Sequence, residues 1–313
     1  MSYTIGSFNM GKANYRSDEK QKKDYMKIAT IIKDENFDVV ALQEVQTKGV
    51  LKHFLLPALG NNEWDFCWDT RKSYSSQSAE GYAYIWKNSI FRLVEANSNP
   101  IIVDGYDIKN NAKDIKTKGL IRPPFLVRLT TEGVNSGPFM ELRFINTHII
   151  CDKPKGITES CSKGGLRRKE LKILAEQIYP RFADDRCFAN NMPAYTIMMG
   201  DYNLCLVGPS PKLEEEMTIC SYPDQTRQDR KLITVQKELS SLKRPENVDE
   251  KAVFPEYYAN DYDHFSYEKS LEQKLKPKVS RVEALGKYYN NNLKDYRREI
   301  SDHVPIKLII NLK

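Results

Sequence analysis

The 313-residue sequence predicts an α/β fold in which two sheets pack against each other. Its opening alternates strand, helix and strand, which favours an α/β layer over a helical bundle or an all-β fold. Further segments look like hairpins, and each half of the chain has a helix and an apolar strand that ends in polar residues. No Pro-, Gly- or Ser-rich linker divides the sequence, so we expect residues 1–313 to form a single domain.

The first elements follow from the spacing of apolar residues. Tyr3–Asn9 is a short β-like run, and Ser17-Asp18-Glu19 gives a helix-start signal. Behind this signal, four apolar residues recur at helical spacing: Tyr25, Ile28, Ala29 and Ile32. Phe37–Leu42 then reads as a buried strand, which ends in Gln43-Glu44.

Two hairpins are expected in the middle of the chain. Gly81–Trp86 and Phe91–Ala96 form the first pair, with a short polar turn between them. Phe125–Thr131 and Phe139–Thr147 form the second pair, joined by a Gly- and Asn-rich connection.

The second half repeats the helix-and-strand pattern. Gly164–Tyr179 predicts a helix with one apolar face, closed by Pro180. Ala194–Met199 is an apolar strand that leads into Gly200-Asp201-Tyr202-Asn203, and Val304–Leu312 is the last strand.

Residues 206–260 are more polar and less regular than the rest. They contain one helical patch, at Leu232–Leu242. A connection of this length between strands is unusual, and long loops on rigid scaffolds often carry specificity. We therefore interpret 206–260 as a variable insertion that shapes substrate choice.

Composition excludes several classes of protein. With 40% hydrophobic residues the chain can bury a core, which excludes a disordered protein. No apolar stretch approaches the roughly 20 residues needed to cross a bilayer, and the N-terminus does not resemble a secretory signal. The six cysteines lack metal-binding spacing, so we expect free thiols and a cytoplasmic location.

The formal net charge of +6 is matched by one segment, Lys269–Arg298, which has nine Lys or Arg residues and three acids. Tyr288, Tyr289 and Tyr296 are interleaved with these charges, as in surfaces that follow phosphates and stack on bases. A solvated helical face is the competing interpretation.

Polar residues collect at the ends of the expected strands. They are Asn9, Glu44, His148, Asp201, Asn203, Asp302 and His303. Such positions converge on one rim of a layered α/β protein. Carboxylate and amide oxygens there suit Mg²⁺, with Mn²⁺ or Ca²⁺ as alternatives. Because two histidines can move protons near neutral pH, the set indicates metal-assisted phosphoester hydrolysis.

Six short motifs then occur in an order that resembles the endonuclease/exonuclease/phosphatase superfamily. They are Ser7-Phe8-Asn9-Met10, Ala41-Leu42-Gln43-Glu44-Val45, Asn146-Thr147-His148, Gly200-Asp201-Tyr202-Asn203, Tyr262-Asp263-His264 and Ser301-Asp302-His303-Val304-Pro305. This resemblance implies the deoxyribonuclease I-like fold, a four-layer α/β/β/α sandwich of two mostly antiparallel sheets.

The resemblance also implies metal ligands and phosphate contacts. Glu44 looks like the principal metal ligand, with Asn9 and Asp302 beside it. Asp201 and Asn203 look like the pair that orients the nucleophile and binds the scissile phosphate.

The same resemblance implies two carboxylate–imidazole pairs. His303 is similar to the general base that Asp263 holds, and His148 is similar to a second histidine that pairs with Glu80. Arg122 resembles a phosphate contact, since a guanidinium fork suits a phosphate.

The superfamily contains enzymes with several substrate classes. Residues 259–264 do not match the inositol 5-phosphatase pattern, and His148 stands where exonuclease III-like enzymes usually have tyrosine. We predict an endonuclease that cleaves DNA. A phosphatase or phosphodiesterase acting on a small or lipid phosphoester, of the inositol phosphate or sphingomyelin type, is the alternative. A binding module with a decayed site is disfavoured because the acidic and histidine residues are all present.

Overall fold

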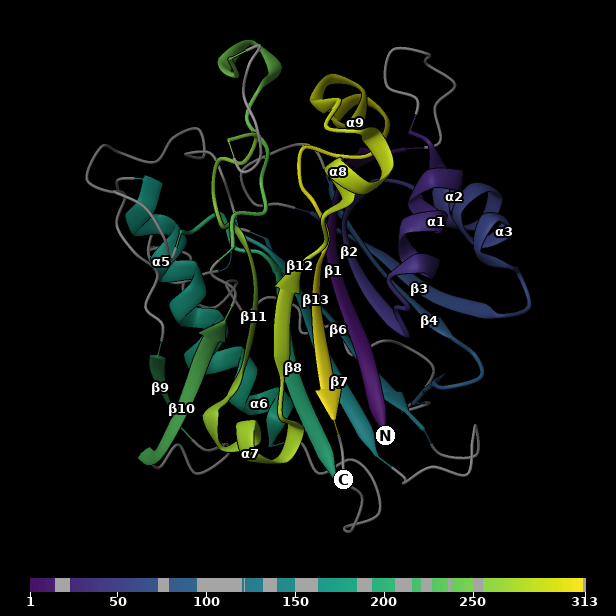
Figure 1. Cartoon of the computed structure of the whole chain (residues 1–313). Helices are drawn as coiled ribbons and strands as arrows, with labels where there is room; N and C mark the ends of the chain where they lie inside the picture. Colours follow the sequence, from purple (N-terminus) through teal and green to yellow (C-terminus); the bar gives the residue numbers. More distant parts are fainter. Residues whose placement is uncertain are drawn as a thin grey trace.

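The computed structural model contains two sheets that pack face to face with helices outside them (Figure 1). It describes residues 1–14, 23–72, 79–94, 120, 122–131, 140–149, 163–184, 193–205, 216–220, 227–235, 238–249 and 256–311. The predicted α/β fold with two packed sheets is confirmed.

The first sheet has the strand order β12-β13-β1-β2-β4-β3. Its strands are β1 (Ser2–Ala13), β2 (Val39–Val45), β3 (Trp64–Lys72), β4 (Ala79–Lys87), β12 (Lys278–Arg281) and β13 (Ile306–Asn311). β1 and β2 are parallel, whereas the other neighbours are antiparallel. The first and last strands of the chain, β1 and β13, thus lie side by side.

The second sheet has the strand order β5-β6-β7-β8-β11-β10-β9. Its strands are β5 (Arg92–Leu93), β6 (Phe125–Thr130), β7 (Glu141–His148), β8 (Ala194–Asp201), β9 (Glu216–Cys220), β10 (Arg227–Val235) and β11 (Asp263–Glu268). β7 and β8 are its parallel pair. The predicted hairpin of residues 125–147 is confirmed as the antiparallel pair β6 and β7.

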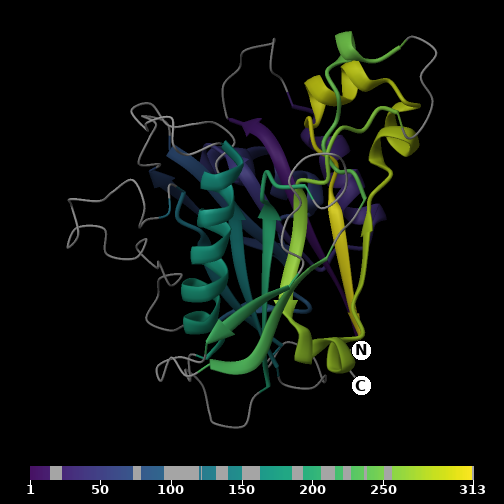
Figure 2. The same ribbon diagram turned by 90° about the vertical axis from the view of Figure 1, so that its left-hand side faces the viewer.

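A helical crossover joins each parallel pair. Between β1 and β2 lies α1 (Tyr25–Asp34), whose buried face includes Ile28 and Ile32. Between β7 and β8 lie α5 (Lys163–Ile173), a π-helical segment (Leu174–Ile178) and α6 (Tyr179–Ala183). Figure 2 shows this second group against the outer face of its sheet. Parallel strands need such crossovers, because a short turn cannot return the chain to the same end of the sheet.

Shorter helical segments complete the fold. They are α2 (Lys48–Val50), a π-helical turn (Leu51–Leu55), α3 (Leu56–Leu59), two 3₁₀ turns (Pro245–Asn247 and Lys269–Leu271), α7 (Glu272–Leu275), α8 (Ala284–Tyr289) and α9 (Leu293–Glu299).

Three apolar clusters separate the layers. The central cluster lies between the sheets and includes Ile5, Tyr84 and Phe144. The second fills the space under α1 to α3 and includes Ile28, and the third lies under α5 and α6 and includes Tyr179. Together they give the four layers α/β/β/α.

One predicted hairpin is wrong. β4 pairs with β2 and β3 in the first sheet, whereas β5, which covers part of the expected strand 91–96, pairs with β6 in the second sheet. Phe91 is buried against Tyr3, with ring centroids 5.4 Å apart, where the chain passes from one sheet to the other. Apolar alternation reports which face of a strand is buried, but it does not report the partner strand.

Three helical expectations need correction. α1 begins at Tyr25 with Asp24 as its N-cap, and the start signal at residues 17–19 lies outside the described residues. Pro180 does not end the second crossover, because it occupies the first turn of α6, where a missing N–H is tolerated. The helical patch at Leu232–Leu242 is wrong, since residues 227–235 form β10, paired with β9 and β11.

No helix in the described part of the chain is long and apolar enough to cross a membrane. Cys67 and Cys205 are free thiols, as expected; the side chains of the other four cysteines lie outside the described part of the structure.

Candidate active site

Polar residues of both sheets meet at one end of the sandwich. In the second sheet, His148, Asp201 and Asp263 occupy one row across β7, β8 and β11, because His148 is in register with Asp201 and Asp201 with Asp263. In the first sheet, Asn9 is in register with Gln43 near the ends of β1 and β2, and Glu44 follows. Strand register therefore brings residues from distant parts of the sequence together.

Asn9 links the two sheets at this end. Its Nδ2 donates to Glu44 Oε1 at 3.3 Å and to Asp201 Oδ2 at 3.0 Å. Glu44 has a left-handed backbone with φ of 57°, and its Oε2 accepts the backbone N–H of Lys12 at 2.8 Å. Two carboxylates from different sheets thus converge on one amide.

Asp201 lies at the centre of the group and is 1% exposed. Its Oδ2 is 3.5 Å from His148 Nε2 and 3.6 Å from His303 Nε2, so it is flanked by both imidazoles. Its Oδ1 accepts the backbone N–H of Asn203 at 2.9 Å. Burial raises the pKa of Asp201, although the neighbouring imidazoles oppose this effect.

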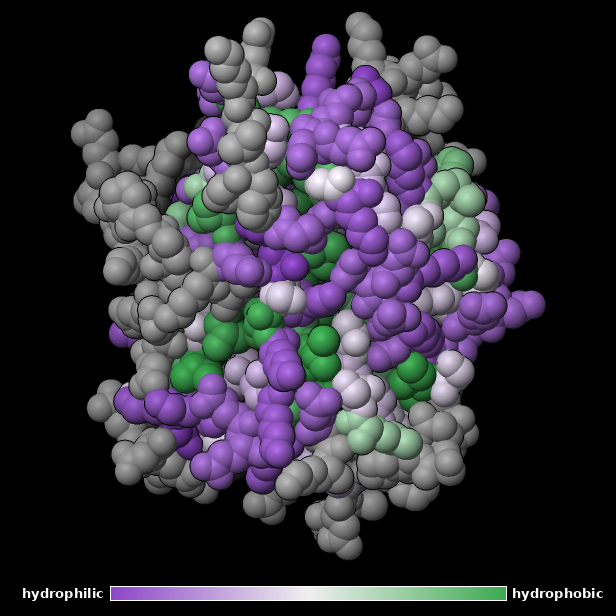
Figure 3. All heavy atoms as spheres, viewed as in Figure 1, coloured by the Kyte–Doolittle hydropathy of each residue, from purple (hydrophilic) through white to green (hydrophobic). Residues whose placement is uncertain are grey.

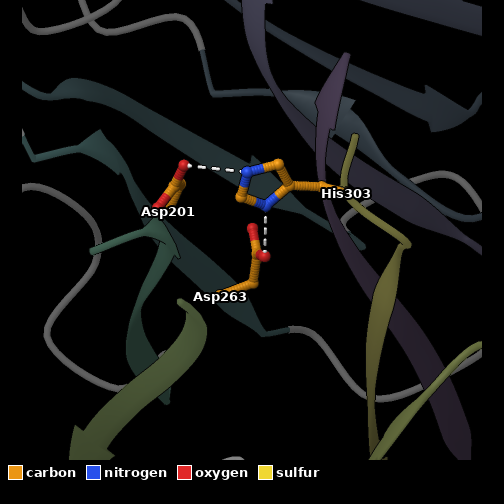
Figure 4. Close-up of side chains that lie close together, drawn as sticks. All are labelled: Asp201, Asp263 and His303. Atoms are coloured by element: carbon orange, nitrogen blue, oxygen red, sulfur yellow. Dashed lines mark hydrogen bonds and ion pairs between the residues drawn. The ribbon is translucent and has the colours of Figure 1, made fainter. Parts of the chain in front are cut away.

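His303 and Asp263 form a hydrogen-bonded pair (Figure 4). His303 Nδ1 lies 2.7 Å from Asp263 Oδ2, and because a carboxylate only accepts, the ring donates through Nδ1 and leaves Nε2 toward Asp201. Ser240 Oγ donates to the same Asp263 oxygen at 2.6 Å. Burial alone would lower the pKa of His303, but the carboxylates of Asp263 and Asp201 raise this pKa well above the ordinary histidine value.

This pair predicts how stability depends on pH in the metal-free protein. The folded-state pKa of His303 exceeds its unfolded value of about 6.5, so its stabilising contribution is complete below that pH and is lost as pH rises through the folded-state pKa. The free energy of unfolding of the wild type minus that of His303→Gln should therefore fall as the pH rises above about 6.5. Urea denaturation in EDTA measures both; a difference that grows with pH would contradict the assignment.

The oxygens of the site fit a hard divalent cation. Glu44 and Asp201 bring like charges to one amide, and buried Asp263 Oδ1 has no hydrogen-bond partner among the described residues. Ligand atoms of Asp201, Asp263 and His303 also lie within 4.8 Å of one another. Converging acidic oxygens of this kind need a cation to offset their repulsion, and Mg²⁺, Mn²⁺ and Ca²⁺ prefer such ligands.

The three predicted metal ligands differ in their surroundings. Glu44 is partly exposed and close to Asn9, whereas the Asp302 side chain is 50% exposed, with Oδ2 3.5 Å from Arg297 Nη2. Asn9 presents its NH₂ group to the carboxylates, and its Oδ1 accepts the N–H of Gly11 at 3.0 Å. An amide binds a cation through oxygen, so Asn9 would have to turn this group to act as a ligand.

Asn203 is fixed from three directions. The backbone of Asn203 is left-handed, with φ of 50°, and its Nδ2 donates to the Ile149 carbonyl at 2.8 Å. Arg167 Nη1 donates to the Asn203 carbonyl at 2.6 Å. Asn203 therefore lies beside Asp201 as predicted, between β8 and the start of α5.

Two predicted residues are not joined to the cluster by these contacts. Arg122 is half-buried, and its backbone N–H donates to Glu170 of α5 at 2.9 Å. Glu80 lies in β4 opposite Arg71, but its side chain is outside the described residues. The phosphate contact of Arg122 and the pairing of Glu80 with His148 stay predictions.

Several supporting residues escaped the sequence analysis. Ser240 comes from the supposed insertion, and Ser301 Oγ donates to the Asn9 carbonyl at 2.6 Å. Beneath the site, Gln43 Nε2 donates to Asn146 Oδ1 at 2.7 Å across the sheets. Serines in loops carry no recognisable signal, but Gln43 and Asn146 lie within the quoted motifs and were findable there.

Two of the three tyrosines in the basic segment 269–298 are buried and cannot stack on bases, whereas Tyr288 is half-buried. Tyr296 is fully buried and donates to the His303 carbonyl at 3.2 Å, and Tyr289 is 7% exposed and donates to Glu299 at 2.9 Å. Lys287 lies 3.3 Å from Glu35, so part of the segment's charge is offset by acids elsewhere. These tyrosines serve packing, which the count of local charges did not reveal.

Residues 6–216 match the model of the Endonuclease/Exonuclease/phosphatase family. The chain belongs to this family. Family membership indicates a phosphoester hydrolase.

Solved structures share the fold of this family member at low sequence identity. ANGEL2, a 2′,3′-cyclic phosphatase solved with adenosine-2′,3′-vanadate, is 15% identical with a TM-score of 0.56, over 99% of this chain and 96% of that one. D. rerio TDP2, solved with a single-strand DNA product, is 14% identical with a TM-score of 0.52, over 99% of both chains. A Bacteroides thetaiotaomicron member of the family is 15% identical with a TM-score of 0.53, over 100% of this chain and 99% of that one.

No curated protein matches the sequence. The deoxyribonuclease I-like fold and the family are thus established by the family match and the solved structures, whereas the substrate must be argued from the site.

Proposed function

We propose that this family member is a Mg²⁺-dependent phosphodiesterase that cleaves DNA as an endonuclease. The observation that carries the proposal is the pair of imidazoles on either side of Asp201, one of them held by Asp263 at 2.7 Å. A positioned imidazole can take a proton from water or give one to a leaving oxygen.

We assign the proton acceptor to Nε2 of His303 in its neutral form, which a bound divalent cation would favour because it opposes the carboxylates that raise this pKa in the metal-free protein. Nδ1 donates to Asp263, which fixes the tautomer and stabilises the imidazolium formed when water loses its proton. His148 Nε2, on the other side of Asp201, is placed to give a proton to the leaving oxygen. Asp201 and Asn203 orient the water and the phosphate between these rings.

Glu44, Asn9 and Asp302 would hold the divalent ion. When bound, this ion offsets the charge of the phosphate and steadies the leaving oxygen. The group of Asp201, Asp263 and His303 is a weaker candidate, because Nδ1 of His303 is already engaged by Asp263.

A polyanionic substrate is supported by basic residues that contact the site. The guanidinium of Arg167 donates to the Asn203 carbonyl at 2.6 Å, and that of Arg297 lies 3.5 Å from Asp302 Oδ2. The surface around α8 and α9, near Asp302, is largely hydrophilic (Figure 3). Cations around an acidic centre favour a substrate with several phosphates.

Plasmid cleavage tests the proposed function. Purified protein with Mg²⁺ or Mn²⁺ should nick and linearise supercoiled plasmid, and EDTA should stop the reaction. Glu44→Ala and His303→Ala, each shown to be folded, are the controls against a contaminating nuclease. If the wild type cleaves neither plasmid nor a bis-aryl phosphodiester, the binding-module interpretation replaces this one.

Salt should separate DNA from a small substrate. If two phosphates are neutralised, kcat/KM on DNA should fall about tenfold between roughly 50 and 200 mM salt, because bound counterions are released. Hydrolysis of the bis-aryl phosphodiester should change little over the same range. Equal and weak salt dependence on both substrates would favour the small or lipid phosphoester alternative.

A further inference from the structure

Lys23 joins the start of α1 to the loop that carries two site residues. Its Nζ donates to the Ile300 carbonyl at 2.8 Å, and the backbone N–H of Asp24 donates to the Glu299 carbonyl at 2.8 Å. Residues 301–303 follow directly, so Lys23 is held against the segment that supplies Asp302 and His303.

The ammonium group of Lys23 and the Asp302 carboxylate both lie next to Gly11. A β-carbon added at Gly11 would lie 3.1 Å from Lys23 Nζ, 3.1 Å from Ser301 Oγ and 3.4 Å from Asp302 Oδ1. Gly11 has φ of 56°, a conformation that suits glycine, and its missing side chain leaves room for these three groups. Burial lowers the pKa of Lys23 to about 8, against the opposing effects of Asp302 and Glu44.

Two fixed cations therefore face the Asp302 carboxylate. Arg297 Nη2 lies 3.5 Å from Oδ2, and Lys23 Nζ is near Oδ1. Arg297 is also held by the carbonyls of Leu242 and Lys243, whereas Lys23 is held by the Ile300 carbonyl. Lys23 therefore adds a positive charge near the proposed ligand Asp302.

We propose that Lys23 is a built-in positive charge that holds the acidic site together without metal and weakens binding of the divalent cation. The proposal rests on the proposed metal site. A fixed cation near Asp302 offsets the negative charge of the metal-free site, and it repels a second cation placed against the Asp302 carboxylate. The two effects are opposite in sign: removing the charge should destabilise the metal-free protein and tighten metal binding.

The test uses the full chain and Mn²⁺ alone. Free Mn²⁺ is followed by electron paramagnetic resonance during titration of wild type, Lys23→Met, Lys23→Arg and Glu44→Ala. Lys23→Met should bind Mn²⁺ about tenfold more tightly than the wild type, and Lys23→Arg should stay within about twofold of it. Without Mn²⁺, the thermal midpoint of Lys23→Met should be lower than that of the wild type.

Lys27→Met is the matched control. Lys27 lies in the same segment but pairs with Glu299 at 3.3 Å and lies over the Tyr289 ring, 4.2 Å from its centroid. This variant removes an equal charge and should leave the Mn²⁺ affinity unchanged.

Two results would overturn the proposal in different ways. If Glu44→Ala abolishes Mn²⁺ binding but Lys23→Met binds as the wild type does, or more weakly, Lys23 has no such role and the metal site stands. If the wild type has no Mn²⁺ site that depends on Glu44, the metal site and the role of Lys23 fall together.

Discussion

His303→Ala should lower the turnover number on DNA by about 10²- to 10⁴-fold, the usual contribution of general acid–base catalysis. The imidazole has one nitrogen fixed by Asp263 at 2.7 Å and the other 3.6 Å from Asp201 Oδ2. Alanine removes the proton acceptor without adding bulk. Single-turnover kinetics at saturating enzyme measure the chemical step directly.

Asp263→Asn tests whether His303 needs its hydrogen bond to Asp263 in order to act as the base. An amide can still contact Nδ1, but it cannot stabilise an imidazolium or enforce the tautomer, so the loss should approach that of His303→Ala. His53→Ala is the control, because His53 is exposed on the turn between α2 and α3. If folded His303→Ala retains activity within about tenfold of the wild type, His303 is not the base.

His148→Ala should cause a loss of similar size if it protonates the leaving oxygen. A substrate with a good leaving group, such as a nitrophenyl phosphodiester, needs less protonation. The loss in His148→Ala should therefore shrink on that substrate, whereas the loss in His303→Ala should not. Equal losses on both substrates would contradict the division of roles.

Glu44→Gln should abolish measurable metal-dependent cleavage at Mg²⁺ concentrations that saturate the wild type. Glutamine keeps the shape of the side chain and an oxygen for the Lys12 N–H, which Glu44 accepts at 2.8 Å, but it loses the negative charge. A neutral oxygen is a poorer ligand for Mg²⁺ than a carboxylate. The loss should appear as a large rise in the Mg²⁺ concentration needed for half-maximal rate.

The choice of glutamine at position 44 reduces the risk that the variant misfolds. Glu44 has a left-handed backbone, so changes that keep side-chain shape are safer than Glu44→Val or another β-branched residue. Glu63→Gln, at an exposed position, controls for loss of one acid. If folded Glu44→Gln cleaves DNA with the wild-type Mg²⁺ dependence, Glu44 is not the principal ligand.

The sequence predicted which residues lie close together better than it predicted the connections between elements. Asn9, Glu44, His148, Asp201 and His303 follow from strand ends and short motifs, and the described structure brings all five together. His148 and Asp201 are the last residues of β7 and β8, which apolar runs report well, whereas Asn9 lies inside β1, four residues before its end.

The failures involved partners distant in the chain. Residues 91–93 alternate like the second arm of a hairpin, yet β5 pairs with β6 across a gap of over thirty residues. Leu232 and Ile233 fit a helical pattern, yet they pair with β11. A short apolar run fits both the helical repeat and the alternation of a strand, and pairing with a neighbouring strand decides that a strand forms here.

By itself, the sequence determined the α/β class, the family and the residue types that can hold a cation and move protons. We propose on the same basis that the chain is one domain, which the pairing of β1 with β13 supports. Only the tertiary structure decided that Asp201 stands between two imidazoles, that Ser240 supports Asp263, and that Lys23 lies against Asp302. Contacts of this kind depend on the register of paired strands and on loops folding back over them, and neither leaves a local pattern in the chain.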